Sequence, residues 1–434
     1  MRPGPRLVPL ALGWLALSVV AAAWEPGRSL WMGAGIVAGL VCLTDLWSLY
    51  RLRFPSVDRR VPHALALGVW SDIGIRLSNA TRHDVTVDVF DHYPGVHGVE
   101  ALPQTQTISS AGWAEVHYRF LATERGEHVF SAVQLLLHSP LRLWRRGALV
   151  ESHDSVRIYP NFSTVAKYAL MATDNRLSEM GIRKRRRRGE GLEFHQLREY
   201  RAGDSFRQVD WKATSRQRKL ISREYQDSRD QQVVFMIDCG RRMTARDDEL
   251  SHFDHTLNSI LLLSYVALRQ GDAVGLMTFS GERRYIPPRK GAGMVNTVLN
   301  SVYDLQPSMQ SPDYANAATE LHKRLRKRSL VVMVTNLRDE DATEVLPALN
   351  LLRRRHLVLL ASLREGVIAS VLAQPVTDFD DAIRLAATQR YLLGRRKVHD
   401  VISRSGVVSL DVEAEKLPIS MVNRYLDIKL SGRL

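Results

Sequence analysis

Three carboxylates in one short segment have the spacing that acid–base chemistry could use. Residues 197–216 read LREYRAGDSFRQVDWKATSR and place Glu199, Asp204 and Asp210 among arginines and aromatic residues. Two carboxylates divide general acid and base roles only where their surroundings set their pKa values apart, and no local feature of the sequence does so here. The same composition suits a clasp against the domain that follows, or a docking face for a partner. All three interpretations stay open.

Turn chemistry predicts the local structure of this segment. We expect a turn at Gly203 and a helix that begins at Asp204, whose side chain would cap it. Arg207 and Asp210 are three residues apart and could pair on the surface of that helix. Trp211 could pack while its indole N–H finds an acceptor.

A second group of polar residues follows predicted strands farther along the chain. Asp238 ends the apolar run QVVFMID, and Asn336 and Asp339 follow the run VVMVT. Ligands of open α/β sheets bind outside the carboxyl ends of the strands. We therefore expect these side chains, with Asp313 from an intervening loop, to line a crevice. Asp238 could instead accept backbone N–H groups at the turn.

An acidic residue at the end of the first strand resembles the von Willebrand factor A domain. That fold carries a metal-ion-dependent adhesion site written DxSxS, in which oxygen ligands hold Mg²⁺. Gly240 and Arg242 stand at the two serine positions here, and a guanidinium remains protonated. We therefore expect no metal and no cofactor, although Asp313 could replace a missing hydroxyl and leave a Mg²⁺ site as the alternative. The expected partner-binding crevice consists of Asp238, Gly240, Arg242, Asp313, Asn336 and Asp339.

Other catalytic sites are not indicated, so we expect a protein that is not an enzyme. The sequence has no GxxxxGK[ST], GxSxG or HExxH motif, and RKGAGMVN lacks the third glycine of a dinucleotide fingerprint. The two cysteines, Cys42 and Cys239, exclude a disulfide framework and a cysteine zinc site.

A run of six cations forms a separate feature. The net charge of the chain is +14, which favours anionic partners. A run of like charges repels itself, so it is predicted to be a solvated loop. Contact with anionic lipid is an alternative, and nucleic acid is a weaker one because no RNA-binding module accompanies the run. This basic loop consists of Arg183, Lys184, Arg185, Arg186, Arg187 and Arg188.

The predicted strands and helices determine where the charged segment and the crevice residues lie. Residues 231–434 alternate apolar strands with amphipathic helices, which predicts a doubly wound α/β domain. Residues 61–160 alternate polar and apolar positions between turn signals, which predicts a β-sandwich-like domain acting as a spacer or docking module. Residues 161–190 are expected to form a helical connector and the basic loop. Residues 191–230 contain the charged segment.

The N-terminus predicts a membrane anchor. Two long apolar runs with a short polar break make residues 1–55 a candidate transmembrane hairpin, with a cleaved signal peptide as the alternative. Asp45 is expected near the inner end of the second helix, where its carboxylate could reach headgroup water.

Flanking cations predict the orientation of this anchor. Arg2 and Arg6 precede the first apolar run, and Arg51 and Arg53 follow the second. The positive-inside rule then places both termini in the cytoplasm, on a multi-pass protein of the cell inner membrane.

The charged segment and the order of the domains resemble the bacterial family called domain of unknown function 58. That family combines the pattern G-x-EF-x-x-LREY-x-x-GD-x-x-R-x-x-DW-x-x-x-x-R with a von Willebrand A-like domain. The family's association with MoxR-type AAA+ ATPases implies such an ATPase as a partner. The signature residues of this chain are Glu193, Arg198, Glu199, Tyr200, Gly203, Asp204, Arg207, Asp210, Trp211 and Arg216.

These features together predict an adaptor anchored in the inner membrane. Its cytoplasmic von Willebrand A-like domain would bind a MoxR-type ATPase or a client of that ATPase. The alternative function is a membrane-tethered binder of anionic lipid or nucleic acid that uses the basic segment.

Overall fold

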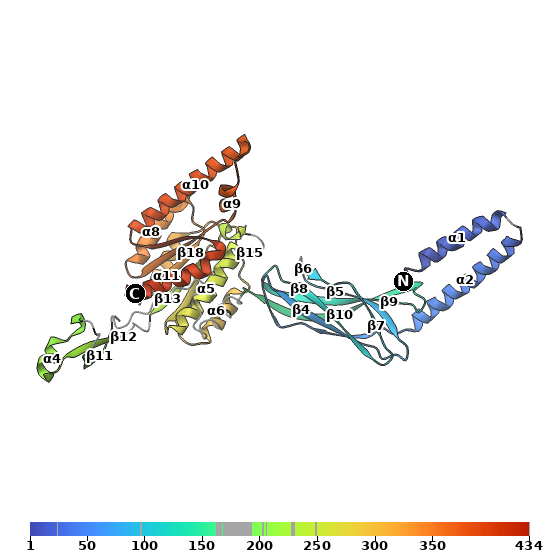
Figure 1. Cartoon of the computed structure of the whole chain (residues 1–434), viewed down its shortest axis with the longest axis horizontal. Coiled ribbons are helices and arrows are strands. Elements are labelled where there is room, and N and C mark those ends of the chain that lie inside the picture. Colours follow the sequence, from blue (N-terminus) through green and yellow to red (C-terminus); the bar gives the residue numbers. More distant parts are fainter. Residues whose placement is uncertain are drawn as a thin grey trace. The chain divides into compact units, whose positions relative to one another are not determined.

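The chain forms two compact units, residues Met1–Tyr159 and Pro160–Leu434 (Figure 1). The computed structural model describes residues 1–23, 25–95, 98–161, 167, 193–201, 204, 206–226, 231–247 and 250–433. The basic loop, Gly203 and the side chain of Glu193 lie outside the described part, as does almost all of the predicted connector. Each unit is described by itself.

The first unit begins with a helical hairpin. Helices α1 (Leu7–Ala23) and α2 (Glu25–Arg51) lie side by side (Figure 1), and the rings of Trp14 and Trp31 stack with centroids 4.8 Å apart. Among the described residues, one helix is long and apolar enough to cross a membrane, over Gly27–Arg51. The apolar part of α1 is shorter, Leu7–Val19.

The rest of this unit is built of two β-sheets. One has the order β1-β10-β9-β5-β7, with β3 parallel to β10, and the other has the order β2-β4-β8-β6. The strands are β1 (Arg2–Pro3), β2 (Ser56–Arg60), β3 (Ala64–Ala66), β4 (Trp70–Ser78), β5 (Val85–His92), β6 (Gly98–Glu100), β7 (Gln104–Ile108), β8 (Trp113–Leu121), β9 (Gly126–His138) and β10 (Trp144–Tyr159).

Alternating side chains join the two sheets. Phe120 on β8 packs on Phe130 on β9, with ring centroids 5.3 Å apart. Between the sheets, Arg59 donates to the Asp91 carboxylate at 2.7 Å, and the Tyr118 hydroxyl donates to the same carboxylate at 2.6 Å. The period-two pattern therefore gives the two-layered β structure that the sequence predicted.

Several hydrogen bonds fix the helical hairpin to the β-sheets. The backbone N–H of Leu141, in the β9–β10 turn, donates to Asp45 Oδ1 at 3.0 Å. Trp144 Nε1 donates to the carbonyl of Cys42, also at 3.0 Å. Asp45 is 3% exposed, so the expectation that its carboxylate reaches headgroup water was wrong: it holds the turn instead.

The second unit contains the signature segment as a small structure of its own. Strands β11 (Glu193–Glu199) and β12 (Ile221–Gln226) form an antiparallel pair. Between them lie the 3₁₀ turn η2 (Phe206–Gln208) and helix α4 (Trp211–Gln217). The predicted helix from Asp204 was wrong in its start, because Asp210 caps α4.

A six-stranded sheet forms the rest of this unit. Its order is β17-β16-β13-β18-β19-β20, parallel except for β17 at one edge. The strands are β13 (Gln232–Asp238), β16 (Ala273–Phe279), β17 (Tyr285–Arg289), β18 (Leu330–Thr335), β19 (Leu357–Arg364) and β20 (Val408–Glu413). The two apolar runs named in the sequence, QVVFMID and VVMVT, fall in β13 and β18.

Helices cover both faces of this sheet, as the doubly wound prediction requires. Val233, Phe235 and Ile237 of β13 enter one core with α5, α6 and α11, whereas Val234 and Met236 enter the other with α7, α8 and α10. The helices are α5 (His252–Arg269), α6 (Met294–Val302), α7 (Tyr314–Arg324), α8 (Ala342–Arg353), α9 (Val367–Ala373), α10 (Phe379–Arg404) and α11 (Leu417–Leu430). Short elements are η3 (Arg241–Thr244), β14 (Arg246–Asp247), β15 (Leu250–Ser251), η4 (Asp339–Asp341) and η5 (Ala414–Lys416).

Candidate functional site

The parallel strands bring their polar termini to one edge of the sheet. Asp238 ends β13, Asn336 directly follows β18, and Glu365 directly follows β19. Because β13, β18 and β19 are paired in parallel, their carboxyl ends meet. This carboxyl edge is where a ligand crevice is expected in an open α/β sheet.

Asp238 is buried at this edge and fully engaged by its neighbours. Its side chain is 1% exposed, its Oδ1 accepts the N–H of Gly240 at 2.8 Å, and its Oδ2 accepts the hydroxyl of Thr335 at 2.7 Å. The hydroxyls of Thr335 and Tyr314 lie 3.1 Å apart. Burial raises the pKa of the Asp238 carboxyl above its ordinary value, and these hydrogen bonds only partly oppose it.

The loop after α6 explains why glycine stands at position 240. The N–H of Arg241 donates to the carbonyl of Gln310 at 3.0 Å, and the N–H of Ser308 donates to the carbonyl of Cys239 at 2.7 Å. A Cβ on Gly240 would lie 2.9 Å from the Gln310 carbonyl oxygen. The backbone of this loop therefore occupies the space that the first serine of a DxSxS motif would need.

Arg242 turns its guanidinium toward the loop after β18. It forms ion pairs with Asp341 and Glu340, and its side chain is almost fully buried. The positive charge of Arg242 acts to lower the pKa of the Asp238 carboxyl. The hydrogen-bond donors of Arg242 are nevertheless directed to the carboxylates of η4.

The two remaining acidic residues of the predicted crevice are both exposed. Asp313 is the N-cap of α7 and accepts the N–H of Asn316 at 2.9 Å. Asp339 accepts the N–H of Glu340 at 3.1 Å and lies next to Gly394 of α10. Among the described residues, no group of three or more His, Cys, Asp or Glu side chains could hold a metal ion.

Asn336 belongs to a buried polar network that the sequence did not reveal. Its side-chain amide donates to Glu365 Oε1 at 3.0 Å and lies 3.4 Å from Nδ1 of His252. Nε2 of His252 lies 3.0 Å from the Asp247 carboxylate. Both ring nitrogens therefore face partners within the network.

Arg395 of α10 is the centre of this network. It is 1% exposed and donates to Asp411 on β20 at 2.8 and 3.0 Å and to Ser362 on β19 at 2.7 Å. It also donates to the backbone carbonyls of Leu337 and Leu363. One guanidinium thus joins the ends of β18, β19 and β20 to α10. Its sequence context, LLGRRKVHD, looks like a solvated cationic face, so no local signal marked it.

The charges of the signature segment pair largely with one another. Arg198 holds the Asp204 carboxylate with two hydrogen bonds of 2.8 and 2.9 Å, and the N–H of Arg201 donates to the same group at 2.9 Å. Lys219 pairs with Glu199 at 2.9 Å. The Arg198 hydrogen bond lowers the pKa of Asp204, and the Lys219 hydrogen bond lowers the pKa of Glu199.

Asp210 has a similar role at the start of α4. It accepts the N–H groups of Lys212 and Ala213, each at 3.0 Å, and pairs with Arg223 rather than with Arg207, the predicted partner. The backbone N–H of Ala213 is the first cause of a lowered pKa for this carboxyl. Glu199, Asp204 and Asp210 thus all have lowered pKa values, which suits permanent ion pairs rather than an acid–base couple.

The aromatic residues of the segment are less covered than the sequence suggested. Phe206 is 68% exposed and Trp211 is 65% exposed, although Phe206 stacks on Tyr200 with centroids 5.6 Å apart. Arg216 lies in the last turn of α4. Whether the segment acts as a clasp or a docking face stays a prediction.

These features define a chain with an apolar N-terminal helix, a two-sheet β part and an α/β part whose strand ends are joined by buried ion pairs. Residues 196–383 match the family model described as "Protein of unknown function DUF58". The resemblance stated from the signature segment is confirmed over that range.

Individual relatives are more distant. The chain is 23% identical over 232 residues to "Uncharacterized protein YeaD" of Bacillus subtilis (strain 168), covering 52% of this chain and 54% of that protein. It therefore spans about half the length of this curated relative. Among solved structures, an aerotolerance-related membrane protein from Bacteroides fragilis aligns with 45% of this chain and 98% of its own, at 13% identity and a TM-score of 0.30. A PapD-like domain of human CEP192 aligns with 24% of this chain and 86% of its own, at 16% identity and a TM-score of 0.18.

Proposed function

We propose that this protein is a membrane-anchored adaptor that binds protein partners at the carboxyl edge of its α/β part. The observation that carries the proposal is an exposed apolar surface on α9 and the first half of α10, called here the α9–α10 arm. Phe379 is 77% exposed and Ile383 is 51% exposed, and Val367, Leu372 and Val376 are also exposed. Exposed apolar side chains on adjoining helices, as α9 and α10 are, are characteristic of interaction sites.

The arm is attached directly to the buried network of the carboxyl edge. The N–H of Gly366, at the start of α9, donates to Asp247 at 2.9 Å. Tyr391 of α10 donates to Glu365 at 3.3 Å, and Arg395 follows one turn later. A partner that docks on the arm would therefore also lie over the strand ends.

We infer that the α/β part is von Willebrand A-like. The strand order with one antiparallel edge strand, and an aspartate at the end of β13, support this assignment. The carboxyl edge does not suit the metal of that fold. Both Asp238 oxygens already accept hydrogen bonds, the loop at Gln310 crowds Gly240, and the Arg242 cation lies nearby. Binding at this edge would then be independent of metal.

The partner that the family resemblance implies is a MoxR-type AAA+ ATPase or its client. The exposed apolar arm supports a protein partner, because apolar anchors supply most of the energy of protein interfaces. The burial of Asp238 favours a structural role for this residue, with Glu340 and the arm reaching the partner.

The anchor would consist of both helices of the hairpin, with both termini in the cytoplasm of a bacterial inner membrane. Apolar side chains around α1 and α2 are exposed, including Leu15 and Ile36, which favours lipid as their surroundings. Since α1 and α2 pack against each other through Trp14 and Trp31, the two helices would insert as a pair.

A capture experiment with purified components tests this function. The full chain is extracted in detergent, immobilised and incubated with a MoxR-type ATPase from the same cells. We expect Phe379→Ser combined with Ile383→Ser to weaken capture by about tenfold or more. Val401→Ser, at an exposed apolar position on the same helix, is the matched control and should bind normally, as should Asp238→Asn. Equal capture by the arm variant and the control would refute the proposal.

A further inference from the structure

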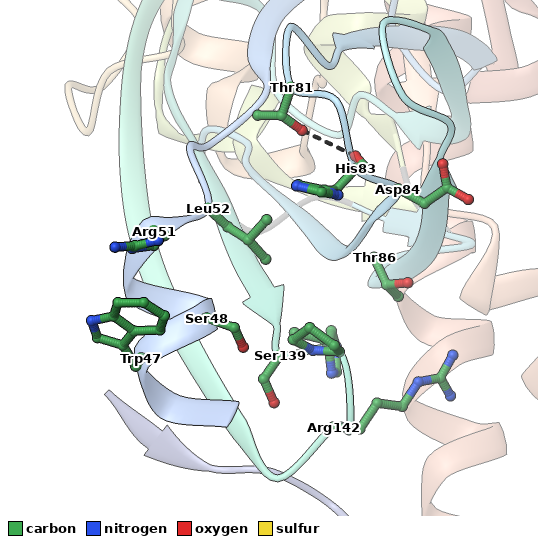
Figure 2. Close-up of a pocket in the computed structure, with 12 residues that line it drawn as sticks. Trp47, Ser48, Arg51, Leu52, Thr81, His83, Asp84, Thr86, Ser139 and Arg142 are labelled. Atoms are coloured by element: carbon green, nitrogen blue, oxygen red, sulfur yellow. Dashed lines mark hydrogen bonds between the residues drawn. The ribbon is translucent and has the colours of Figure 1, made fainter. Parts of the chain in front are cut away.

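A separate pocket lies within the first unit, where the end of α2 meets the β-sheets. Its volume is about 690 Å³, large enough for a small polar molecule. Figure 2 shows helix residues on one side, the segment from Thr81 to Thr86 opposite, and the β9–β10 turn below. The lining residues used in the argument are Trp47, Arg51, Asp84, His138, Ser139 and Arg142.

The walls of the pocket are held by bonds between α2 and the β9–β10 turn. Besides the bonds of Asp45 and Trp144, the Arg146 guanidinium donates to the carbonyl of Tyr50 at 3.3 Å. The wall formed by α2 is therefore the last part of the helix that is long and apolar enough to cross a membrane, Gly27–Arg51. If α2 spans the bilayer, the pocket opens at the depth of the lipid headgroups.

Two arginines flank this pocket and suit an anion. Arg51 and Arg142 lie on opposite sides of the view in Figure 2. The guanidinium carbon of Arg51 lies 3.6 Å from the centroid of the Trp47 ring. Stacking on an indole occupies the face of a guanidinium and leaves its N–H groups directed outward from its edge. Such a pre-oriented fork is suited to phosphate oxygens.

A buried histidine forms part of the pocket wall. His138 lines the pocket and is 8% exposed. Its Nε2 lies 2.8 Å from the Asp88 carboxylate on β5. Both ring nitrogens are covered by protein atoms, so the histidine contributes the shape of the wall rather than a hydrogen bond to a ligand.

The remaining polar groups suit hydroxyls. The Asp84 carboxylate uses one oxygen to accept the N–H of Ser110 at 2.9 Å. The Ser139 hydroxyl oxygen accepts the N–H of Trp144 at 3.0 Å, so its own hydrogen can be donated elsewhere. A ligand with a phosphodiester at one end and hydroxyls at the other matches two cations, a carboxylate and a hydroxyl donor.

We propose that this pocket binds the headgroup of an anionic phospholipid of the phosphatidylglycerol type. The phosphodiester lies between Arg51 and Arg142, and the glycerol hydroxyls reach Asp84 and the Ser139 hydroxyl. The proposal rests on the membrane anchoring in the proposed function but not on ATPase binding. It also differs from lipid attraction to the basic loop, because it is stoichiometric and located at the base of α2.

Native mass spectrometry of the full chain in detergent tests the proposal. The probe is dihexanoyl phosphatidylglycerol, with zwitterionic dihexanoyl phosphatidylcholine as the comparison of zero net charge and inorganic phosphate as the competitor. We expect one phosphatidylglycerol to bind in preference to phosphatidylcholine. Arg51→Gln with Arg142→Gln should weaken this binding by about tenfold or more, through loss of charge-assisted hydrogen bonds. Circular dichroism of the variant verifies its fold.

The matched control is Arg53→Gln with Arg6→Gln. Both arginines are exposed and neither lines the pocket, and their replacement removes the same two positive charges, so diffuse attraction to anionic lipid would be weakened equally by this change. Equal binding of the two lipids, or equal losses in the double variant and the control, would overturn the proposal. Complete displacement by millimolar phosphate would assign the pocket to a soluble phosphate compound instead. Because the assay needs neither ATPase nor a bilayer, its failure is distinguishable from failure of the adaptor proposal.

Discussion

At the residue scale, a carboxyl group as deeply buried as that of Asp238 is costly to ionise. Its hydrogen bonds to Gly240 and Thr335 suit either a carboxylate or a neutral acid. Burial nevertheless raises its pKa. Asp238, which resembles a metal ligand in the sequence, therefore holds the turn after β13, and its burial disfavours the ionised form of its carboxyl.

This pKa predicts a pH-dependent stability. The unfolded chain loses the Asp238 proton near pH 4, whereas the folded chain keeps it until the raised pKa. As the pH rises through that window, the unfolded state is favoured and the fold becomes progressively less stable. The full destabilisation is reached above the pKa of the folded state. Asp238→Asn cannot ionise; its amide oxygen can still accept the Gly240 N–H, while its amide N–H would donate to the Thr335 hydroxyl, which reverses the direction of that bond. We expect the melting temperature of this variant, relative to wild type, to rise with pH in scanning calorimetry.

The control for this measurement is Val401→Ser, at an exposed position on α10, which neither removes nor adds an ionisable group. Its difference from wild type should stay flat over the same pH range. A flat difference for Asp238→Asn as well would show that the Asp238 carboxyl is ionised at no cost in the folded protein.

The crowding at Gly240 gives a second prediction at this scale. A serine there would place its Cβ against the Gln310 carbonyl, so Gly240→Ser should cost about 1–3 kcal/mol of stability, as overpacking does. Restoring the motif with Gly240→Ser and Arg242→Ser should therefore not produce a stabilising magnesium site. Calorimetry with and without millimolar Mg²⁺ measures this. A magnesium-dependent rise in the melting temperature of the unmodified chain, abolished by Asp238→Asn, would contradict both the crowding argument and the predicted absence of metal.

At the scale of elements, the α9–α10 arm depends on one buried cation. Arg395 is the first fully buried residue of α10, and the half of the helix before it is mostly exposed. The guanidinium therefore fixes the point at which the arm leaves the sheet. Its partners on three strand ends would be left without a cation if it were removed.

Arg395→Met should loosen the arm and the strand ends together. Breaking a buried ion pair from one side typically costs about 3–5 kcal/mol. We expect faster amide hydrogen exchange in peptides covering the ends of β18 and β19 and the whole of α10. Arg396→Met, at the neighbouring exposed position, provides the comparison. Similar exchange in the two variants would mean that Arg395 is not the anchor of the arm.

Elements that follow from neighbouring residues could be predicted from the sequence, whereas contacts between residues far apart in the chain could not. Apolar runs such as residues 233–237 become buried strands because each side chain contributes to one core or the other, so the sheet was predictable. The cap of α4 was misplaced from Asp210 to Asp204 because Arg198, six residues away, binds Asp204 instead. Arg395, His252 and Glu365 meet only after folding, and the Gln310 carbonyl reaches Gly240 from a distant loop. No residue spacing in the sequence indicates these long-range contacts.

At the scale of the whole molecule, the two units differ in the kind of side chain that they expose. The helices of the first unit expose apolar side chains around their circumference, which water would disfavour. The α/β part instead has two closed cores and a localised exposed arm. The net charge of +14 favours anionic surroundings, which agrees with the proposed membrane anchor.

The distribution of cations predicts the topology of the anchor. Arg2 and Arg6 flank the start of α1, and Arg51 and Arg53 follow the end of α2, whereas Arg28 is the arginine near the turn between the helices. Because short cation-rich segments remain in the cytoplasm, both ends of the hairpin should lie there. Fluorescent protein fused to either terminus should then fluoresce.

Alkaline phosphatase, which is active only outside the cytoplasm, provides the complementary readout. It should be inactive at both termini and active when inserted at the turn near Arg28. If α2 alone crossed the membrane, the N-terminus would lie outside the cytoplasm and the chain that follows α2 would lie inside it. Phosphatase fused to the N-terminus would then be active. Adding three lysines at the turn tests the cause: the positive-inside rule predicts that they reduce phosphatase activity there, whereas three glutamines should not. Activity unchanged by the lysines would show that the contacts of α1 with α2, rather than the flanking charges, decide how the anchor inserts.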